Sequence, residues 1–369
     1  MSRDGPLELL TPKPPAARQR LINLLAPLLG LALIIFVGGI SEYINEGSLN
    51  YWSPQNQCLI LTQIVTVAIG AIGMTMIIIA GGIDLSAGSL IALASVATAW
   101  MLREFAPGAV RLEGAAALWL PLAAMAVGIG IGGAAGAVNG GLITTRRLMP
   151  FIVTLGMMTF ARGLAKGIAK QERIEAPLNW LASFTDSNLT LGELNLDWGP
   201  LVWRGPVATS PAVILTILLA IAAAVILGRT AFGRHIFAIG SNESTARLCG
   251  VRVEATKRTL YILGGALFGL AGVTDFGRLS VGDPTTAIGK ELDIIAAVVI
   301  GGGSLNGGAG SIFGTLIGAL LMAHLRNLCV HLGLPNYVQE MVVGAVIVLA
   351  VDLDKLRQRK RLAAGGNIY

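Results

Sequence analysis

The sequence contains few of the residues that build catalytic and metal-binding sites. Only 3 histidines and 3 cysteines occur among its 369 residues, and they form no metal-ligand or disulfide pattern. The P-loop motif G-x-x-x-x-G-K-[ST] is absent, so the chain is not expected to bind and hydrolyse ATP itself. The histidines His235, His324 and His331 provide no Ser-His-Asp set. These absences disfavour an enzyme, and we expect no metal and no cofactor on this chain.

Charged residues are scarce as well. They make up 13% of the sequence, against about 25% in soluble domains. Hydrophobic residues make up 54%, and the mean hydropathy is +0.71. The apolar residues occur in runs of about 20, the length of a helix that spans a bilayer. No alternating segments of about 10 residues, typical of membrane barrels, are present. The sequence therefore predicts an all-α polytopic membrane protein.

About ten segments are expected to form transmembrane or re-entrant helices. They are 21–40, 57–79, 87–102, 116–143, 150–168, 207–227, 259–277, 291–301, 311–331 and 337–352. Because no clear small-residue cleavage site follows the first segment, it is interpreted as a retained span and not as a signal peptide. Segment 291–301 is short and either spans or re-enters. The membrane domain thus covers 21–352, between a disordered tail at 1–20 and a basic tail at 353–369.

The distribution of Lys and Arg predicts the orientation, because cytoplasmic loops carry an excess of both residues. The two tails, the pair Arg146-Arg147 and the loop 229–258 are basic. Segment 41–56 has no Lys or Arg, and 171–206 has five acids and two arginines. Both termini are therefore predicted to be cytoplasmic. The net charge of +6 follows from these loops, and no aromatic-basic interleaving suggests nucleic acid.

The longest external segment is 171–206. Its tryptophans, Trp180, Trp198 and Trp203, suggest that it lies along the membrane interface. Docking of an external partner and a simple surface elaboration are both open for this segment.

The basic loop 229–258 is too long and too patterned for a simple connector. It carries six Lys/Arg against two acids. The residues 241–244, Ser-Asn-Glu-Ser, can cap a short helix, TARLCG, whose end is marked by Gly250. A capped helix on the cytoplasmic face of a membrane protein indicates a docking element.

Glycines recur at every fourth position in two of the segments. One row is Gly128, Gly132, Gly136 and Gly140, the other is Gly310, Gly314 and Gly318, and Gly265 and Gly269 form a pair. In lipid, small residues drive helix association by letting backbones approach closely. Tight packing within the chain is the favoured interpretation. A subunit interface and a moving seam are the alternatives.

Two apolar runs, 77–95 and 298–318, are each interrupted by a glycine-rich polar bend. Such interruptions in a transporter point to the substrate pathway, although tight turns at the cytoplasmic surface would show the same pattern. Asp84 would then cap the following helix. The candidate pathway residues are Asp84, Ser86, Asn139, Asp293, Ser304 and Asn306. His324, Arg326 and Asn327 also cluster, either at a pore or interface or by snorkelling.

Four ordered blocks resemble a known family. They are GGIDLSAGSL at 81–90, FIVTLGMMTFARGLAKG at 151–167, FGRHIFAIGSNESTARLCGV at 232–251 and ELDIIAAVVIGGGSLNGGAGSIFGTLIGALLM at 291–322. These blocks are similar to those of the ribose/xylose/galactose-type permease subunits of bacterial ABC importers. The resemblance covers about residues 57–352, within the branched-chain amino-acid/monosaccharide permease superfamily.

The resemblance implies a multi-pass protein of the bacterial inner membrane that forms a pathway for a monosaccharide with a second, identical or paralogous, permease subunit. A separate ATPase with two nucleotide-binding domains would bind ATP and Mg²⁺, and an external sugar-binding protein would deliver the sugar. The segment 232–251 would couple the permease to the ATPase. Its matching positions are Gly233, Ala238, Gly240, Asn242, Glu243, Ala246 and Gly250. Ser244-Thr245 replaces a more usual acidic or alanine pair.

Two alternatives to the monosaccharide permease remain at this point. One is a branched-chain amino-acid or autoinducer-2 ABC permease, which would work by the same mechanism on a different ligand. The other, from a different class, is a stand-alone channel or secondary carrier.

Overall fold

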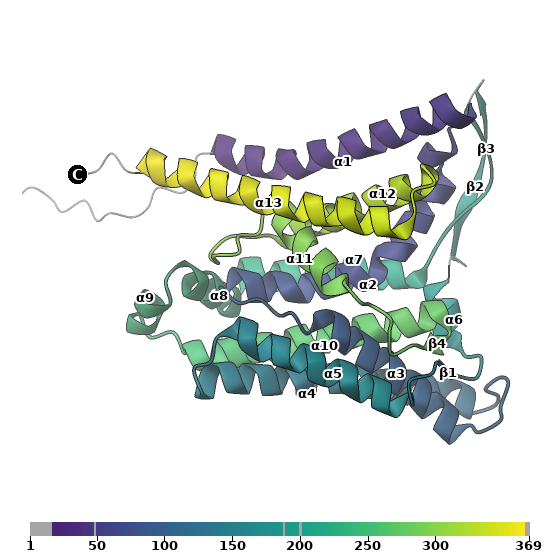
Figure 1. The fold of residues 1–369 in the computed structure, drawn as a ribbon, viewed down its shortest axis with the longest axis horizontal. Helices are drawn as coiled ribbons and strands as arrows, with labels where there is room; N and C mark the ends of the chain where they lie inside the picture. Colours follow the sequence, from purple (N-terminus) through teal and green to yellow (C-terminus); the bar gives the residue numbers. More distant parts are fainter. Residues whose placement is uncertain (1–16, 48, 187–188, 199–200, 366–369) are drawn as a thin grey trace, which may run out of the picture.

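The computed structural model describes residues 17–47, 49–186, 189–198 and 201–365 (Figure 1). Ten of its helices correspond to the ten predicted segments: α1 (Ala17–Glu46), α2 (Pro54–Ile79), α3 (Ala87–Phe105), α4 (Ala116–Thr145), α5 (Pro150–Ile168), α7 (Pro211–Arg229), α10 (Val253–Leu279), α11 (Lys290–Ile300), α12 (Ile312–His331) and α13 (Asn336–Gly365). Among the described helices, seven are long and apolar enough to cross a membrane. The chain is an all-α polytopic membrane protein.

The shorter elements gather at the two ends of the bundle. One end carries η1 (Asn50–Trp52), β1 (Ile174–Glu175), α6 (Trp180–Thr185), β4 (Val281–Gly282) and the hairpin of β2 (Leu189–Trp198) with β3 (Leu201–Thr209). We name it the hairpin end. The opposite end carries α8 (Ala231–Ser241) and α9 (Glu243–Leu248), together with the start of α1 and the end of α13 (Figure 1). The basic loop and both described chain ends thus lie at one end, as the predicted topology requires.

The hairpin differs from the predicted organisation of this region. The sixth span was predicted to begin at residue 207, but β3 continues to Thr209 and α7 begins at Pro211. The reason is local: the Ser210 hydroxyl accepts a hydrogen bond from the Ala212 amide at 3.1 Å, and proline suits the first helical position. Trp203 donates from Nε1 to the Leu49 carbonyl at 3.3 Å. Its indole therefore ties the hairpin to the loop before α2.

The tails also differ from their predicted limits. Helix α1 begins at Ala17, so the predicted disordered tail 1–20 overlaps it, and residues 1–16 lie outside the described part of the chain. Helix α13 continues through the basic segment to Gly365. Residues 353–365 are rich in Leu, Lys, Arg, Gln and Ala, which favour a helix even where no apolar face directs it.

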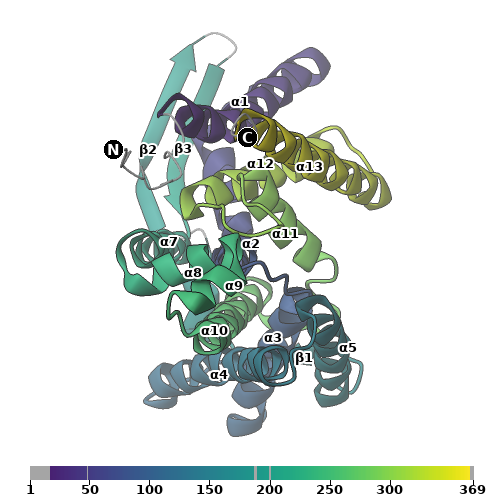
Figure 2. The same ribbon diagram turned by 90° about the vertical axis from the view of Figure 1, so that its left-hand side faces the viewer.

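Figure 2 shows two groups of helices around α2. Helices α3, α4, α5 and α10 lie on one side of it, and α1, α12 and α13 lie on the other. Most of α2 is buried, because it packs against α10 on the first side and against α11 and α12 on the second. A central helix that is apolar all round is what such a position requires.

The glycine row of α4 lies directly on α10. A Cβ on Gly132 would overlap the carbonyl oxygen of Gly265, and one on Gly136 would overlap that of Tyr261. On Gly140 it would lie 3.1 Å from the Arg258 Cα atom. The two backbones therefore touch along the seam, as small residues permit in membrane proteins.

In the second row, Gly314 and Gly318 lie against backbone carbonyls at Gly301 and Ala297. Gly310 does not belong to this helix face, because α12 begins only at Ile312. The row that the sequence predicted is therefore shorter by one residue.

Helix α11 is too short to cross a membrane alone. Its 11 residues measure about 16 Å at 1.5 Å each, roughly half of the hydrocarbon thickness. The segment before it starts at β4 near the hairpin end, whereas the loop after it donates from the Gly308 amide to Ile79 at the far end of α2. Segment 281–301 therefore runs from the hairpin end to the opposite end of the bundle as a half-helix preceded by irregular chain.

Candidate functional site

The basic loop folds into two helices where the sequence predicted one. Thr230 caps α8, because its hydroxyl accepts from the Gly233 amide at 3.1 Å. Asn242 then separates α8 from α9, and its side-chain oxygen accepts from the Thr245 amide at 2.9 Å. Helix α9 thus begins at Glu243, two residues before the predicted TARLCG helix. The sequence predicted a cap within residues 241–244, and Asn242 is the residue whose side chain provides it.

Gly250 ends α9 as its type and position predicted. It has φ +83°, a conformation that glycine adopts without steric cost. Its amide donates to Arg247 at 3.1 Å, and the Val251 amide donates to Ala246 at 3.1 Å. This pair of hydrogen bonds is the Schellman arrangement of a helix C-terminus, which gives the short helix a defined end.

The two sides of α9 differ sharply in exposure. Ala246 is buried with Ile239 of α8 and Val253 of α10 in a small apolar cluster. On the outer side, Leu248 is 89% exposed, more than any other large hydrophobic residue of the described chain. Sequence reasoning missed Leu248, because a helix of six residues shows no readable hydrophobic period. The structure thus presents a leucine at the tip of a capped helix.

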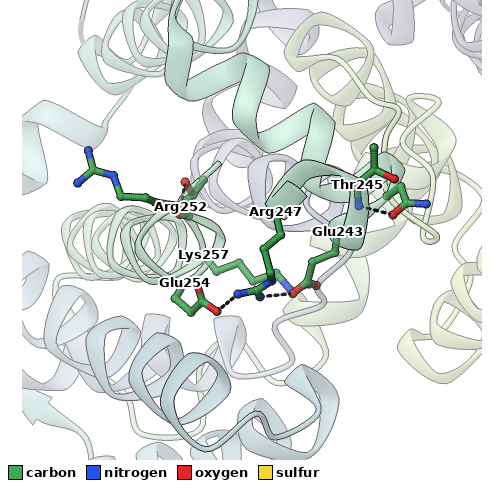
Figure 3. Close-up of polar contacts among 8 residues, drawn as sticks. Glu243, Thr245, Arg247, Arg252, Glu254 and Lys257 are labelled. Carbon is green, nitrogen blue, oxygen red and sulfur yellow. Dashed lines mark hydrogen bonds and ion pairs between the residues drawn. The ribbon is translucent and has the colours of Figure 1, made fainter. Parts of the chain in front are cut away.

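Ion pairs hold the inner side of α9 on α10 (Figure 3). Arg247 forms salt bridges with Glu254 and, at 3.4 Å between Nη2 and Oε1, with Glu243. Lys257 Nζ lies 2.6 Å from Glu243 Oε2. The hydrogen bond from Arg247 to the Glu254 carboxylate raises the pKa of the guanidinium. Arg252 points away from this network in Figure 3. It therefore contributes positive charge to the surface but does not help to hold α9 on α10.

The ion pairs line a polar cavity of about 490 Å³ next to the α4–α5 connection. Arg147, in that connection, adopts φ +53° and lines the cavity with Glu243, Glu254 and Lys257. The predicted basic pair at 146–147 and the basic loop 229–258 therefore lie together at one end of the bundle.

Exchanging the charges of one ion pair tests the tether. Arg247→Glu should leave α9 less firmly oriented. The amount of docking partner that co-purifies with the chain should fall by about threefold, a small effect because exposed ion pairs contribute little. The double variant Arg247→Glu, Glu254→Arg should restore part of what Arg247→Glu loses, because it rebuilds the pair with position 254 in reversed polarity but leaves two carboxylates, at 243 and 247, next to each other. A double variant that is no better than the single one would show that Arg247 acts in some other way.

Two of the three glycines predicted for coupling, Gly233 and Gly240, face inward, whereas Gly250 has open space around it. A Cβ on Gly233 would overlap the Leu227 carbonyl oxygen, and one on Gly240 would overlap that of Ile79 at the end of α2. The Cβ on Gly240 would also lie 2.5 Å from the Gly308 amide nitrogen. Ala238 packs beside the buried Ile239 cluster. Gly240 therefore places α8 in backbone contact with both interrupted segments.

The two interrupted segments meet at this point. Gly308 donates to the Ile79 carbonyl at 2.8 Å, and Gly81 lies beside Asn306. Ser304 is buried in the same turn, where its carbonyl accepts from the Gly307 amide at 2.9 Å. Two segments more than 200 residues apart thus form one turn cluster against α8, which their separate sequence patterns could not show.

Asp84, Ser86 and Asn139 form a second cluster, fully buried between α3, α4 and α5. The Asp84 carboxylate accepts from the Ser86 amide at 2.9 Å and from the Ser86 hydroxyl. Asn139 Nδ2 lies 3.2 Å from the Ser86 hydroxyl oxygen and 3.5 Å from Asp84 Oδ2. Thr154 of α5 accepts from the Leu85 amide at 3.1 Å. The cluster fixes the irregular chain that leads into α3, and Asp84 caps the amide just before that helix.

Asp293, the remaining candidate, lies apart from both clusters. It is on α11 in the half nearer the hairpin end, where its carboxylate pairs with Arg326 of α12. The six candidate pathway residues thus occupy three places along the bundle: Asp84, Ser86 and Asn139 together, Ser304 and Asn306 together, and Asp293 alone.

Comparison with known proteins places this architecture in a family. Residues 57–351 match the family described as branched-chain amino acid transport system / permease component. The chain belongs to this family. The ribose import permease protein RbsC of Escherichia coli K12 is 37% identical over 331 residues, covering 89% of this chain and 93% of the relative. No solved structure matches.

Other relatives are permeases named for other sugars. The L-arabinose ABC transporter permease protein AraH of Azospirillum brasilense is 31% identical over 314 residues, covering 85% of this chain and 84% of the relative. The xylose transport system permease protein XylH of Escherichia coli K12 is 31% identical over 383 aligned positions, covering 89% and 92%. The resemblance seen in the four sequence blocks is therefore confirmed at the level of the family and of nearly the whole chain.

Proposed function

We propose that this chain is the membrane-spanning permease subunit of an ATP-driven importer for a monosaccharide in the bacterial inner membrane. The relatives named for ribose, arabinose and xylose support the substrate class. The observation that supports the proposal most directly is α9, a capped helix with an exposed leucine that is joined through α8 to the interrupted segments. Without a P-loop in the chain, the energy would enter at this helix from a separate ATPase with two nucleotide-binding domains.

The contacts of α8 supply a route for that energy. Closure of the ATPase on ATP and Mg²⁺ would displace α9, and the apolar cluster of Ala246, Ile239 and Val253 would carry the displacement to α8 and α10. Gly240 would pass it to the turn cluster at Ile79 and Gly308, because backbone in direct contact cannot yield. The interrupted helices would then alternate access between the two ends.

The remaining partners follow from the same proposal. A second permease subunit would complete the pathway, and an external sugar-binding protein would dock at the hairpin end. A branched-chain amino acid as substrate, which the description of the family suggests, and an ATPase-independent carrier are the competing functions.

Uptake measurements decide between these functions. Deleting the gene in its source organism should abolish uptake of one of three radiolabelled pentoses, D-ribose, D-xylose or L-arabinose, and the gene returned on a plasmid should restore it. L-Leucine uptake serves as the control and should not change. Loss of leucine uptake alone would identify an amino acid, and not a sugar, as the substrate. Pentose uptake that persists after ATP depletion would establish an ATPase-independent carrier.

A further inference from the structure

A charged cavity lies in the half of the bundle nearer the hairpin end. It has a volume of about 150 Å³ and lies between α2, α10, α11 and α12. Its polar lining is Gln63, Arg278, Lys290, Asp293 and Arg326, and Ala319 and Ala323 line it as small residues. Of the polar residues, the sequence singled out Asp293 and Arg326, in two separate segments.

One carboxylate, that of Asp293, pairs with two of the three cationic residues of the cavity. Asp293 has only 3% of its side chain exposed, and both of its oxygens lie 2.8 Å from Arg326 Nη2. Lys290 Nζ lies 3.7 Å from Asp293 Oδ2. Arg278 pairs with the buried Asp275 at 3.3 Å. The Nε atom of Arg326 is buried and has no hydrogen-bond partner among the described residues.

Two of the polar groups of this cavity, Arg326 and Gln63, lie away from the ends of their helices. Arg326 lies five residues before the end of α12, about 8 Å along the helix axis. Gln63 is exposed nine residues into α2, about 14 Å from the start of that helix. Charged groups at such depth are costly in lipid and face a water-filled cavity or a substrate path. The charged groups at this depth face one polar cavity, as this cost requires.

The chemistry of the lining suits a polyhydroxyl compound. A hydroxyl group donates one hydrogen bond and accepts others, so vicinal hydroxyls are satisfied where acceptors and donors alternate. Asp293 supplies acceptor oxygens, and the partly exposed side chains of Arg326 and Lys290 supply donors. Gln63 supplies both in one side chain.

We propose that this cavity is a transit subsite for a monosaccharide, in which Asp293 and Arg326 hydrogen-bond the sugar hydroxyls on its way from the hairpin end. The proposal rests on the proposed function, since it places the sugar inside this chain. Asp293 and Arg326 hold each other in place, and Gln63 lines the same cavity.

Uptake of the three labelled pentoses by the complemented deletion strain tests the subsite. Arg326→Gln should lower uptake by about tenfold or more, because it leaves the buried Asp293 charge with a weaker partner. Gln63→Leu removes the amide group that would hydrogen-bond the sugar, at an exposed position. Ala323→Leu fills the cavity. Each of these two should lower uptake by about tenfold, the effect of losing a polar contact or of adding methylenes to a pocket.

A second Arg–Asp pair provides the matched control. Arg173 Nε lies 2.9 Å from Asp283 Oδ2 at the hairpin end, with Arg173 73% exposed, and it does not line the cavity. Arg173→Gln should leave uptake within about twofold, as expected of an exposed pair. All variants should reach the membrane and co-purify the ATPase at the wild-type level, which separates loss of the subsite from loss of assembly.

The outcomes separate the two proposals. If the unaltered gene restores no pentose uptake, the proposed function fails and the subsite with it. If it restores uptake and Gln63→Leu and Ala323→Leu transport at the wild-type rate, only the subsite is wrong. Should Arg326→Gln fail to accumulate in the membrane, these two variants still decide, because neither removes a buried charge.

Discussion

Replacing Leu248 by glutamate is expected to abolish co-purification of the ATPase with the permease. Leu248 is 89% exposed at the end of α9, and the proposed coupling would bury it in the partner's groove. A carboxylate left unpaired in such a contact costs several kcal/mol. A loss of about 2 kcal/mol already lowers affinity roughly 30-fold. The measurement is the ATPase recovered with the tagged permease from detergent-solubilised membranes.

A matched exposed residue controls for the substitution itself. Val110 is 82% exposed in the connection between α3 and α4, at the hairpin end (Figure 1). Val110→Glu should leave ATPase recovery unchanged. Because Leu248 is already exposed, neither variant should alter the amount of permease in the membrane. Equal ATPase recovery from the wild type and Leu248→Glu would show that α9 is not the docking element, whatever the charge of the loop around it.

The coupling segment shows what local signals can and cannot predict. Asn242 and Gly250 predicted α9 because a cap and a left-handed glycine act through their immediate neighbours. Helix α8 was missed, since Gly233 and Gly240 each lower helix propensity by about 1 kcal/mol. Its contacts with α2 and Gly308 provide the tertiary packing that overrides this propensity.

The candidate pathway shows the same limit at longer range. The interruptions near Asp84 and Ser304 were visible as glycine-rich bends, but their mutual contact depends on how α2 and α12 pack. Asp293 and Arg326 are 33 residues apart, and only the antiparallel packing of α11 on α12 pairs them. Composition and hydropathy predicted the fold class and the ten helices. The hairpin β2–β3 was not predicted, because the external segment was interpreted only by its charge and its tryptophans.

The glycine seam was predicted from spacing, and its partner helix can be tested by substitution. Gly136→Val should lower the thermal stability of the purified permease severely, because its side chain would overlap the Tyr261 carbonyl. Overpacking of a core typically costs about 1–3 kcal/mol, and a rigid backbone neighbour places this site at the upper limit. Gly136→Ala should be intermediate. The measurement is the fraction of monodisperse protein that remains after heating in detergent.

Gly130, on the same helix, separates packing from helix propensity. A Cβ there would meet no atom within 4 Å. Gly130→Ala should therefore preserve or raise stability by about 0.5–1 kcal/mol, since alanine favours the helix over glycine. If Gly136→Ala and Gly136→Val were both as stable to heating as Gly130→Ala, α4 and α10 would not touch along this seam. If instead Gly136→Val remained stable but stopped transport, the seam would be a moving surface, and close backbone contact would serve sliding of α4 on α10 rather than stability.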